Sequence, residues 1–159
     1  MLNSVVQYLH EHNLLPAICF VFSRKKTEEY AHIISQSLHD GKTMNIISNR
    51  CKQILIQKLP NYKEYIDLPE YLKLVKILVK GIAHHHSGML PVFKEMIELL
   101  FAEGYIKILF ATETFAVGIN MPAKTVLFTS LQKFDGHQFR YLHPYEYTQM
   151  AGRAGRRGI

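Results

Sequence analysis

The sequence predicts an α/β domain built around a mainly parallel sheet, and three observations carry this prediction. Short, unbroken apolar runs rich in branched and aromatic residues recur along the chain, which is typical of strands buried on both faces. Segments with apolar residues at helical spacing separate these runs. Polar residues follow the runs directly, and the carboxyl ends of parallel strands share one edge of a sheet, where ligands bind.

Four apolar runs are predicted to be strands, and the periodic segments between them helices. The strands are expected over residues 17–22, from 82 into a run of histidines, over 106–110 and over 125–129. Helices are expected over residues 2–13, from 23 to 38, over 45–59, from 72 to 80, from 91 to 103 and from 144 to 151. Residues 131–143 show neither pattern and are predicted to form a loop.

The second helix and the segment after it carry more specific expectations. Ser23 is suited to cap the second helix, and Asp40-Gly41 is expected to end it. Its buried side is predicted to consist of Tyr30, Ile33, Ile34 and Leu38. Residues 45–80 are interpreted as a lysine-rich helical insertion between two core units. Its second helix is expected to bury Leu72, Val75, Ile77, Leu78 and Val79.

Composition limits the class of protein. The chain has 159 residues, the size of one domain, and 48% of them are apolar, enough for a hydrophobic core. The net charge of +6 suits a polyanionic partner without requiring one. Cys19 and Cys51 stand in apolar surroundings, so we expect two buried thiols in a reducing compartment and no disulfide framework. The sequence has neither a membrane-length apolar run nor a secretory signal.

The segment Gln149–Gly158 is the densest polar motif. It interleaves glycines, which let a ligand approach the backbone, with arginines, whose planar charged groups fit phosphate oxygens. Arg153 and Arg156 are three positions apart and would project to one side of a helical turn. A phosphate clamp and a solvated basic tail both fit this composition when it is taken alone.

Three further motifs follow predicted strands. Ser23-Arg-Lys-Lys26 suits a phosphate at a helix start, and an ordinary surface turn is the alternative. His84-His-His86 is not interpreted as a metal site, because adjacent strand residues point in alternating directions. One buried histidine is expected, with the others bonded to backbone or phosphate. Residues 111–123 combine hydroxyls, an asparagine and a glycine that permits close backbone approach, which suits a ligand loop, and an ordinary strand-to-helix turn is the alternative.

Asp40-Gly-Lys-Thr43 superficially resembles a phosphate-binding loop. That loop requires a glycine five residues before its second glycine, and this position is Gln36. The segment is also expected to end a helix, whereas a phosphate loop opens one. We therefore predict no phosphate loop at this place.

In this order, the motifs resemble the second RecA-like lobe of a superfamily 2 helicase, and they are most similar to the superkiller-type DExH-box RNA helicases that serve the RNA exosome. The similarity covers residues 16–38 and 81–158. It is carried by Phe-Val-Phe-Ser-Arg24, by Gly81-Ile-Ala-His-His-His-Ser-Gly-Met-Leu-Pro91, by the run from Leu109 to Ala123, by Lys133-Phe-Asp-Gly136 and by the run from Glu146 to Gly158. It implies a RecA-like three-layer domain over residues 1–159, with helices on both sides of the sheet.

The resemblance implies a role for each matching position. Arg153 and Arg156 match arginines that reach the γ-phosphate of ATP on the other lobe, and Gln149 matches a residue that senses or positions this phosphate. The positions implied to contact the nucleotide are Gly118, Asn120 and Gly152. The positions implied to contact the nucleic-acid backbone are Ser23, Arg24, His86, Ser87, Gly88, Thr112, Glu113 and Thr114. No residue is implied to bind a metal.

The family's phosphate-loop lysine motif and Asp-Glu-x-His motif do not occur in the sequence. In the family both belong to the first lobe, which would bind most of the ATP and its Mg²⁺. The chain also stops at Ile159, where the family continues with a further strand. We therefore expect one lobe that is truncated at its C-terminal end and does not hydrolyse ATP alone.

The resemblance implies half of an ATP-driven motor that moves along single-stranded RNA from 3′ to 5′. Its expected partners are RNA, the first lobe of the same polypeptide and components of the RNA exosome, in the nucleus or the cytoplasm and not at a membrane. Two alternatives stay open at this point. One is a DNA-repair helicase of the same superfamily, and the other is a non-enzymatic nucleic-acid-binding or adaptor module.

Overall fold

The computed structural model describes residues 2–112, 123–132 and 136–141. The helices are α1 (Leu2–Glu11), α2 (Arg24–Ile33), α3 (Gly41–Lys58), the short 3-10 helix η1 (Tyr62–Glu64), α4 (Pro69–Leu78) and α5 (Pro91–Ala102). The strands are β1 (Ala17–Phe20), β2 (Ile82–His85), β3 (Ile108–Ala111), β4 (Thr125–Gln132) and β5 (Gly136–Tyr141). The helix expected from 144 to 151 lies outside the described residues.

The strands form one sheet in the order β2-β3-β1-β4-β5. The first four are parallel, with Ala17 of β1 opposite Ile108 of β3 and Thr125 of β4. The predicted mainly parallel sheet is thus confirmed. The predicted loop over 131–143 is wrong, because β4 continues to Gln132 and β5 pairs with it in antiparallel fashion. The β5 segment His137-Gln-Phe-Arg-Tyr141 is too polar to stand out as a strand by its sequence.

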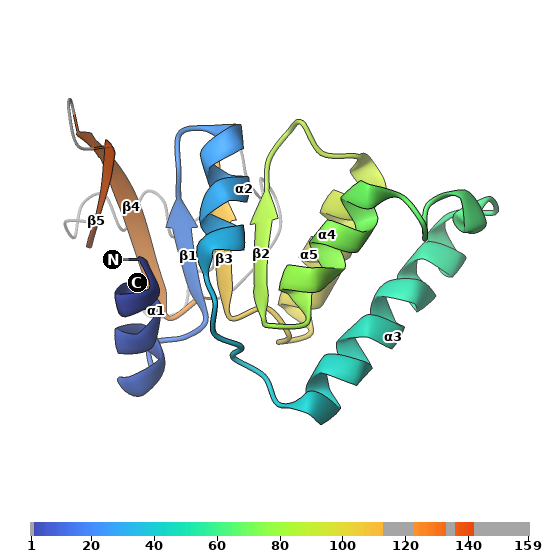
Figure 1. The fold of residues 1–159 in the computed structure, drawn as a ribbon, viewed down its shortest axis with the longest axis horizontal. Helices are drawn as coiled ribbons and strands as arrows, with labels where there is room; N and C mark the ends of the chain where they lie inside the picture. The colour runs from blue at the N-terminus through green and yellow to red at the C-terminus, as the bar shows by residue number, and fades with distance from the viewer. Residues whose placement is uncertain (1, 113–122, 133–135, 142–159) are drawn as a thin grey trace.

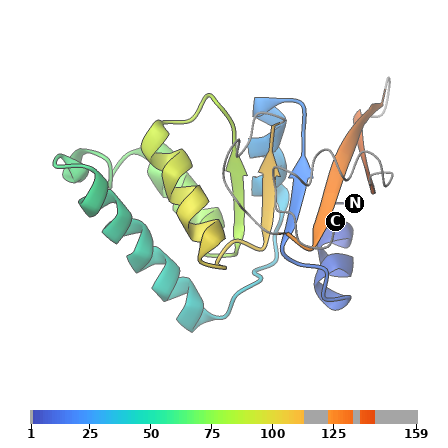
Figure 2. The same ribbon diagram turned by 180° about the vertical axis from the view of Figure 1, so that it is seen from behind.

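Helices cover both faces of the sheet. Tyr30 of α2 packs edge-on against Phe110 of β3 on one face, and this helix crosses the front of the sheet in Figure 1. On the opposite face Glu98 of α5 reaches His85 of β2, and α5 comes to the front when the molecule is turned (Figure 2). Successive strand residues point to opposite faces. Every residue of β2 and β3 is buried, so both strands are covered on both sides. This layering confirms the predicted RecA-like α/β class.

The core of α2 differs from the prediction. Ile33 is 53% exposed, and the buried side of the helix consists of Thr27 and Ala31, followed by Ile34 just beyond its end. The prediction extended the helical periodicity to Leu38, but the helix ends at Ile33 and the chain turns away there. Phe22, predicted to lie in a buried strand, is 60% exposed because β1 ends at Phe20.

Asp40-Gly41 opens α3 and does not close α2. The Asp40 side chain accepts a hydrogen bond from the Thr43 amide at 2.8 Å, which is helix N-capping and lowers the pKa of this carboxyl. The predicted helix end at Asp40-Gly41 is therefore wrong and does not count against a phosphate loop here. Gln36 still stands where a phosphate loop requires its first glycine.

The segment from α3 to α4 is helical, as predicted. The helix α3 lies at the end of the molecule away from β5 and contacts α4 and α5 (Figure 1). Arg50 of α3 donates two hydrogen bonds to the Glu103 carboxylate at the end of α5. In α4 the prediction for Leu72 is wrong: it is 55% exposed, and the buried residues are Tyr71, Leu74, Ile77 and Leu78.

Both cysteines are free and buried, which confirms that part of the prediction. Burial raises the pKa of Cys51 to about 12, and burial also raises the pKa of Cys19 well above its ordinary value. These thiols therefore act as small apolar side chains. Among the described helices, none is long and apolar enough to cross a membrane.

Candidate nucleic-acid interface

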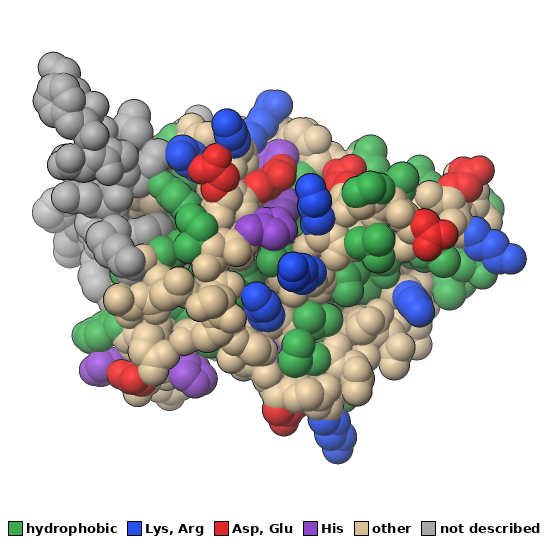
Figure 3. Space-filling model, viewed as in Figure 1, with side chains coloured by type: hydrophobic (Ala, Val, Ile, Leu, Met, Phe, Trp, Pro, Cys, Tyr) green, Lys and Arg blue, Asp and Glu red, His purple; other side chains and the backbone are tan. Residues whose placement is uncertain are grey.

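The first turn of α2 stands at the carboxyl end of β1. Ser23 caps the helix as predicted, since its hydroxyl oxygen accepts a hydrogen bond from the Lys26 amide at 3.2 Å. Thr27 is fully buried, and its hydroxyl donates to the Arg24 carbonyl oxygen at 2.6 Å. These contacts fix the turn that carries Arg24, Lys25 and Lys26. Figure 3 shows basic side chains at the end of the molecule where α2 begins, with acidic side chains among them.

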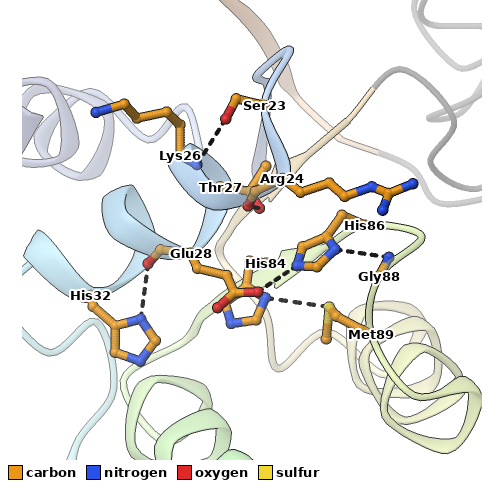
Figure 4. A network of polar contacts seen from close by, with 10 residues as sticks. All are labelled: Ser23, Arg24, Lys26, Thr27, Glu28, His32, His84, His86, Gly88 and Met89. Carbon is orange, nitrogen blue, oxygen red and sulfur yellow. Dashed lines mark hydrogen bonds and ion pairs between the residues drawn. The ribbon is translucent and has the colours of Figure 1, made fainter.

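The turn Ser87-Gly88 stands at the carboxyl end of β2. The Gly88 amide donates a hydrogen bond to Nδ1 of His86 at 3.0 Å. A Cβ atom at Gly88 would lie 3.5 Å from Cδ of Arg24, so the Arg24 stem lies against this glycine. Figure 4 shows the two segments side by side. Two motifs far apart in the sequence therefore form one continuous surface.

The third strand end belongs to β3. The Thr112 amide donates a hydrogen bond to the His85 carbonyl oxygen at 3.3 Å, which holds Thr112 beside the end of β2. The predicted gathering of polar motifs at one sheet edge is thus confirmed for the ends of β1, β2 and β3. The other predicted site residues lie outside the described residues: Glu113, Thr114, Gly118, Asn120, Gln149, Gly152, Arg153 and Arg156.

The expectation of one buried histidine in His84-His-His86 is wrong, because all three are between 5% and 7% exposed. The sheet buries alternate residues against different helices. His84 lies on the α2 face with Nδ1 3.3 Å from Met89 Sδ, whereas His85 points to α5, with Nε2 2.7 Å from Glu98 Oε2. Burial lowers the pKa of His84 to about 4 and also lowers the pKa of His85. His84 is therefore neutral at neutral pH.

His86 is held by protein on both sides of its ring. Nε2 lies 2.5 Å from Glu28 Oε2, and Nδ1 accepts from the Gly88 amide. Glu28 was not predicted as a site residue, although it stands four residues after Arg24 and therefore on the same side of α2. Glu28 and Glu29 are adjacent, and sequence alone does not tell which one faces β2. Direct contact of His86 with nucleic acid stays a prediction.

Glu28, His84 and His86 are close enough to suggest a metal site, since their ligand atoms lie within 4.8 Å of one another. The hydrogen bonding of His86 argues against this use. A backbone amide only donates, so Nδ1 of His86 carries a lone pair and the neutral ring holds its proton on Nε2. The nitrogen that faces Glu28 is then a donor and has no free lone pair for a metal.

The comparisons with known proteins agree with this geometry. The family model described as helicase conserved C-terminal domain matches residues 25–158. The antiviral helicase SKI2 of Saccharomyces cerevisiae is 49% identical over 160 residues, which cover 98% of this chain and 12% of the relative. The DExH-box ATP-dependent RNA helicase DExH10 of Arabidopsis thaliana is 46% identical over 159 residues, which cover 97% of this chain and 15% of the relative.

The exosome RNA helicase MTR4 of Homo sapiens is 44% identical over 160 residues, covering 98% of this chain and 15% of the relative. The chain thus spans about an eighth to a seventh of the length of these curated relatives. The match covers the segment from α3 to α4 as well as the motifs on which the sequence resemblance rested. The chain belongs to the helicase conserved C-terminal domain family, and within it to the group of SKI2-like and MTR4-like DExH-box RNA helicases.

Proposed function

We propose that this chain is the second motor lobe of an ATP-dependent RNA helicase that moves 3′ to 5′ along a single strand. The observation that carries the proposal is the meeting of Ser23, Arg24, Ser87, Gly88 and Thr112 at one sheet edge in a member of this family. The domain assignment to residues 1–159, with a helical insertion near 45–80, is part of the same proposal.

The edge suits a sugar-phosphate backbone. Arg24 provides a permanent positive charge and the first turn of α2 provides backbone amides, which together favour a phosphate group. Ser87 and Thr112 contribute hydroxyls, and Gly88 lets the strand approach the main chain. Contacts of this kind fix position and register without reading sequence. We assign the same task to Glu113 and Thr114.

The nucleotide side of the proposal concerns residues outside the described part of the chain. We assign Arg153, Arg156 and Gln149 to the γ-phosphate of ATP, and Gly118, Asn120 and Gly152 to the nucleotide. ATP and Mg²⁺ would be held mainly by a first lobe, because the sequence contains neither a phosphate-loop lysine motif nor an Asp-Glu-x-His motif. The two sets of residues together would couple the state of ATP to the grip on RNA.

RNA is the favoured substrate because the names of two of the relatives above include RNA helicase. The human relative's name also includes the exosome, so we propose exosome components as partners and the nucleus or cytoplasm as the compartment. The single strand is proposed as the bound form because the family resemblance implies it, and contacts to phosphate and sugar require no base pairing.

The 159-residue chain alone is expected not to hydrolyse ATP, because it supplies arginines but no phosphate loop or magnesium ligands. The measurement is phosphate release by the purified chain with saturating ATP, Mg²⁺ and RNA. The Arg156→Ala variant of the same chain provides the background. Turnover above that of the variant would contradict the assignment of the phosphate loop to another lobe.

The full-length protein is expected to show ATP hydrolysis that single-stranded RNA stimulates more than single-stranded DNA of the same sequence. The 2′-hydroxyl is the group by which a protein distinguishes the two at a backbone site. Equal stimulation, or stimulation by DNA only, would favour a DNA-repair helicase of the same superfamily. Nucleic-acid binding without any hydrolysis would favour the adaptor module.

A further inference from the structure

Glu28 and His86 connect two turns at the proposed RNA edge. Glu28 lies in α2, one helical turn after Arg24, and His86 lies between β2 and the turn Ser87-Gly88. The distance between Glu28 Oε2 and His86 Nε2 is 2.5 Å. The His86 ring is buried, whereas about half of the Glu28 side chain is accessible to solvent. The contact is drawn in Figure 4.

The two bonds of His86 have defined directions. The Gly88 amide donates to Nδ1 at 3.0 Å, so Nε2 carries the proton and donates it to the Glu28 carboxylate. A hydrogen bond to a charged acceptor is stronger than one between neutral groups, and burial of the ring strengthens it further. Glu28 therefore sets the orientation of the ring, and the ring sets the direction of the Gly88 amide.

The same pair fixes the position of Arg24. Residues four apart on a helix lie one above the other, so Glu28 anchors the side of α2 from which Arg24 projects. The Arg24 stem rests on Gly88, since a Cβ at this glycine would lie 3.5 Å from Arg24 Cδ and 3.1 Å from two atoms of the His86 ring. Gly88 leaves room for this contact.

We propose that Glu28 and His86 are positioning residues that hold Arg24 and the Ser87-Gly88 turn at a fixed spacing, so that both contact one RNA backbone together. In this role His86 acts through Gly88, in addition to the direct backbone contact that the family resemblance predicts for it. The inference rests on the function proposed above, because it requires RNA at this edge. It adds to that function two residues whose effect is on RNA binding and not on the chemistry of ATP.

The test uses the full-length protein and measures ATP hydrolysis at saturating ATP against the concentration of a single-stranded RNA. Glu28→Ala is expected to raise the RNA concentration at half-maximal stimulation about tenfold, the range for loss of a hydrogen bond to a charged group. The plateau rate is expected to stay within about twofold, because no group near ATP changes. Glu28→Gln is expected to raise this RNA concentration less than Glu28→Ala does, since its amide oxygen still accepts from Nε2 of His86 in a weaker, neutral hydrogen bond.

The variant His86→Asn distinguishes the effect of the Ser87-Gly88 turn from the effect of the contact between His86 and Glu28 of α2. An asparagine side chain accepts a hydrogen bond from the amide two residues later, so the Ser87-Gly88 turn keeps its acceptor. The connection to Glu28 is lost. We expect the same weakening as for Glu28→Ala, and no further weakening when the two changes are combined, which is the signature of residues that act as a pair.

Glu98→Ala is the matched control. It removes the acceptor of a second His–Glu pair, His85 with Glu98, on the opposite face of the same strand. It is expected to leave the RNA dependence unchanged, and thermal unfolding of each variant reports damage to the fold. If RNA stimulates the wild type and Glu28→Ala leaves the half-maximal RNA concentration unchanged, the positioning role is overturned while the lobe assignment stands.

Two other results would also overturn the positioning role. One is an equal effect of Glu98→Ala, which would indicate general loosening of β2. The other is a Glu28→Gln variant as weak as Glu28→Ala, because the hydrogen bond survives in the former. If the wild type is not stimulated by RNA at all, the proposed function fails, and the positioning role fails with it.

Discussion

Replacing Arg153 or Arg156 by alanine in the full-length protein is expected to lower kcat for ATP hydrolysis by about 10³-fold, the lower end of the range for arginines that reach a transferring phosphoryl group. Negative charge spreads over the phosphoryl oxygens in the transition state, and a planar guanidinium stabilises it there. RNA affinity is expected to change little, since the residues assigned to RNA are different ones. Single-turnover hydrolysis and RNA binding measured on the same preparations check both expectations.

Arg157 is the matched control for this prediction. It stands next to Arg156 in the same glycine-rich segment and carries the same charge, but the family resemblance assigns it no contact with the γ-phosphate. Arg157→Ala is expected to lower kcat by less than about tenfold, as for a charge that acts only at longer range. A loss equal to that of Arg156→Ala would mean that the segment acts through its total charge, as a basic tail.

Topology explains why much of the candidate site was predictable from sequence. Apolar runs such as Ala17–Phe20 are long enough to identify buried strands, and parallel strands bring their carboxyl ends to one edge. Ser23 and Thr112 follow such runs, and Ser87 follows the strand that begins at Ile82, so their proximity follows from the order of the strands. Ser23 was also predictable as a cap, because the preference depends only on the residue and the helix start.

The parts that sequence did not predict depend on the choice between two equally suitable local structures. Asp40-Gly41 fits a helix end through its glycine and a helix start through its aspartate, and the bond from the Thr43 amide to Asp40 decides for the start. Ile33 has the spacing of a buried residue, but the helix ends there and its side chain is exposed. Hydrophobic periodicity does not predict the residue at which a helix ends.

The sequence also did not predict which side chains from distant elements contact the three histidines. Each of His84, His85 and His86 is buried because a different group meets it: Met89 after β2, Glu98 in α5 and Glu28 in α2. The alternation of a strand predicts that neighbours diverge, and it correctly separates His85 from the other two. The alternation does not predict which glutamate of a neighbouring helix contacts the histidines on each face of the sheet.

Phe93→Ala is expected to lower the free energy of unfolding by about 4 kcal/mol, the usual cost of removing a fully buried phenylalanine ring. Phe93 of α5 has no solvent exposure. Its ring centroid lies 6.1 Å from that of Tyr71 in α4 and 6.5 Å from that of Tyr65, just after η1. The loss would leave a cavity that these two rings line. Urea unfolding of the 159-residue chain, followed by circular dichroism, measures the change.

Leu90→Ala is the control, since Leu90 immediately precedes α5 and is 37% exposed. This variant is expected to lower the free energy of unfolding by less than about 1 kcal/mol.

The number of unfolding transitions tests whether the segment from α3 to α4 folds together with the sheet. Tyr65 and Tyr71 belong to the segment from α3 to α4, so their packing on Phe93 makes this segment part of the same core as the sheet. A single transition in both variants is therefore expected. Two separate transitions in the wild type would mean that the segment unfolds independently, and the contact with Phe93 would then contribute little to stability.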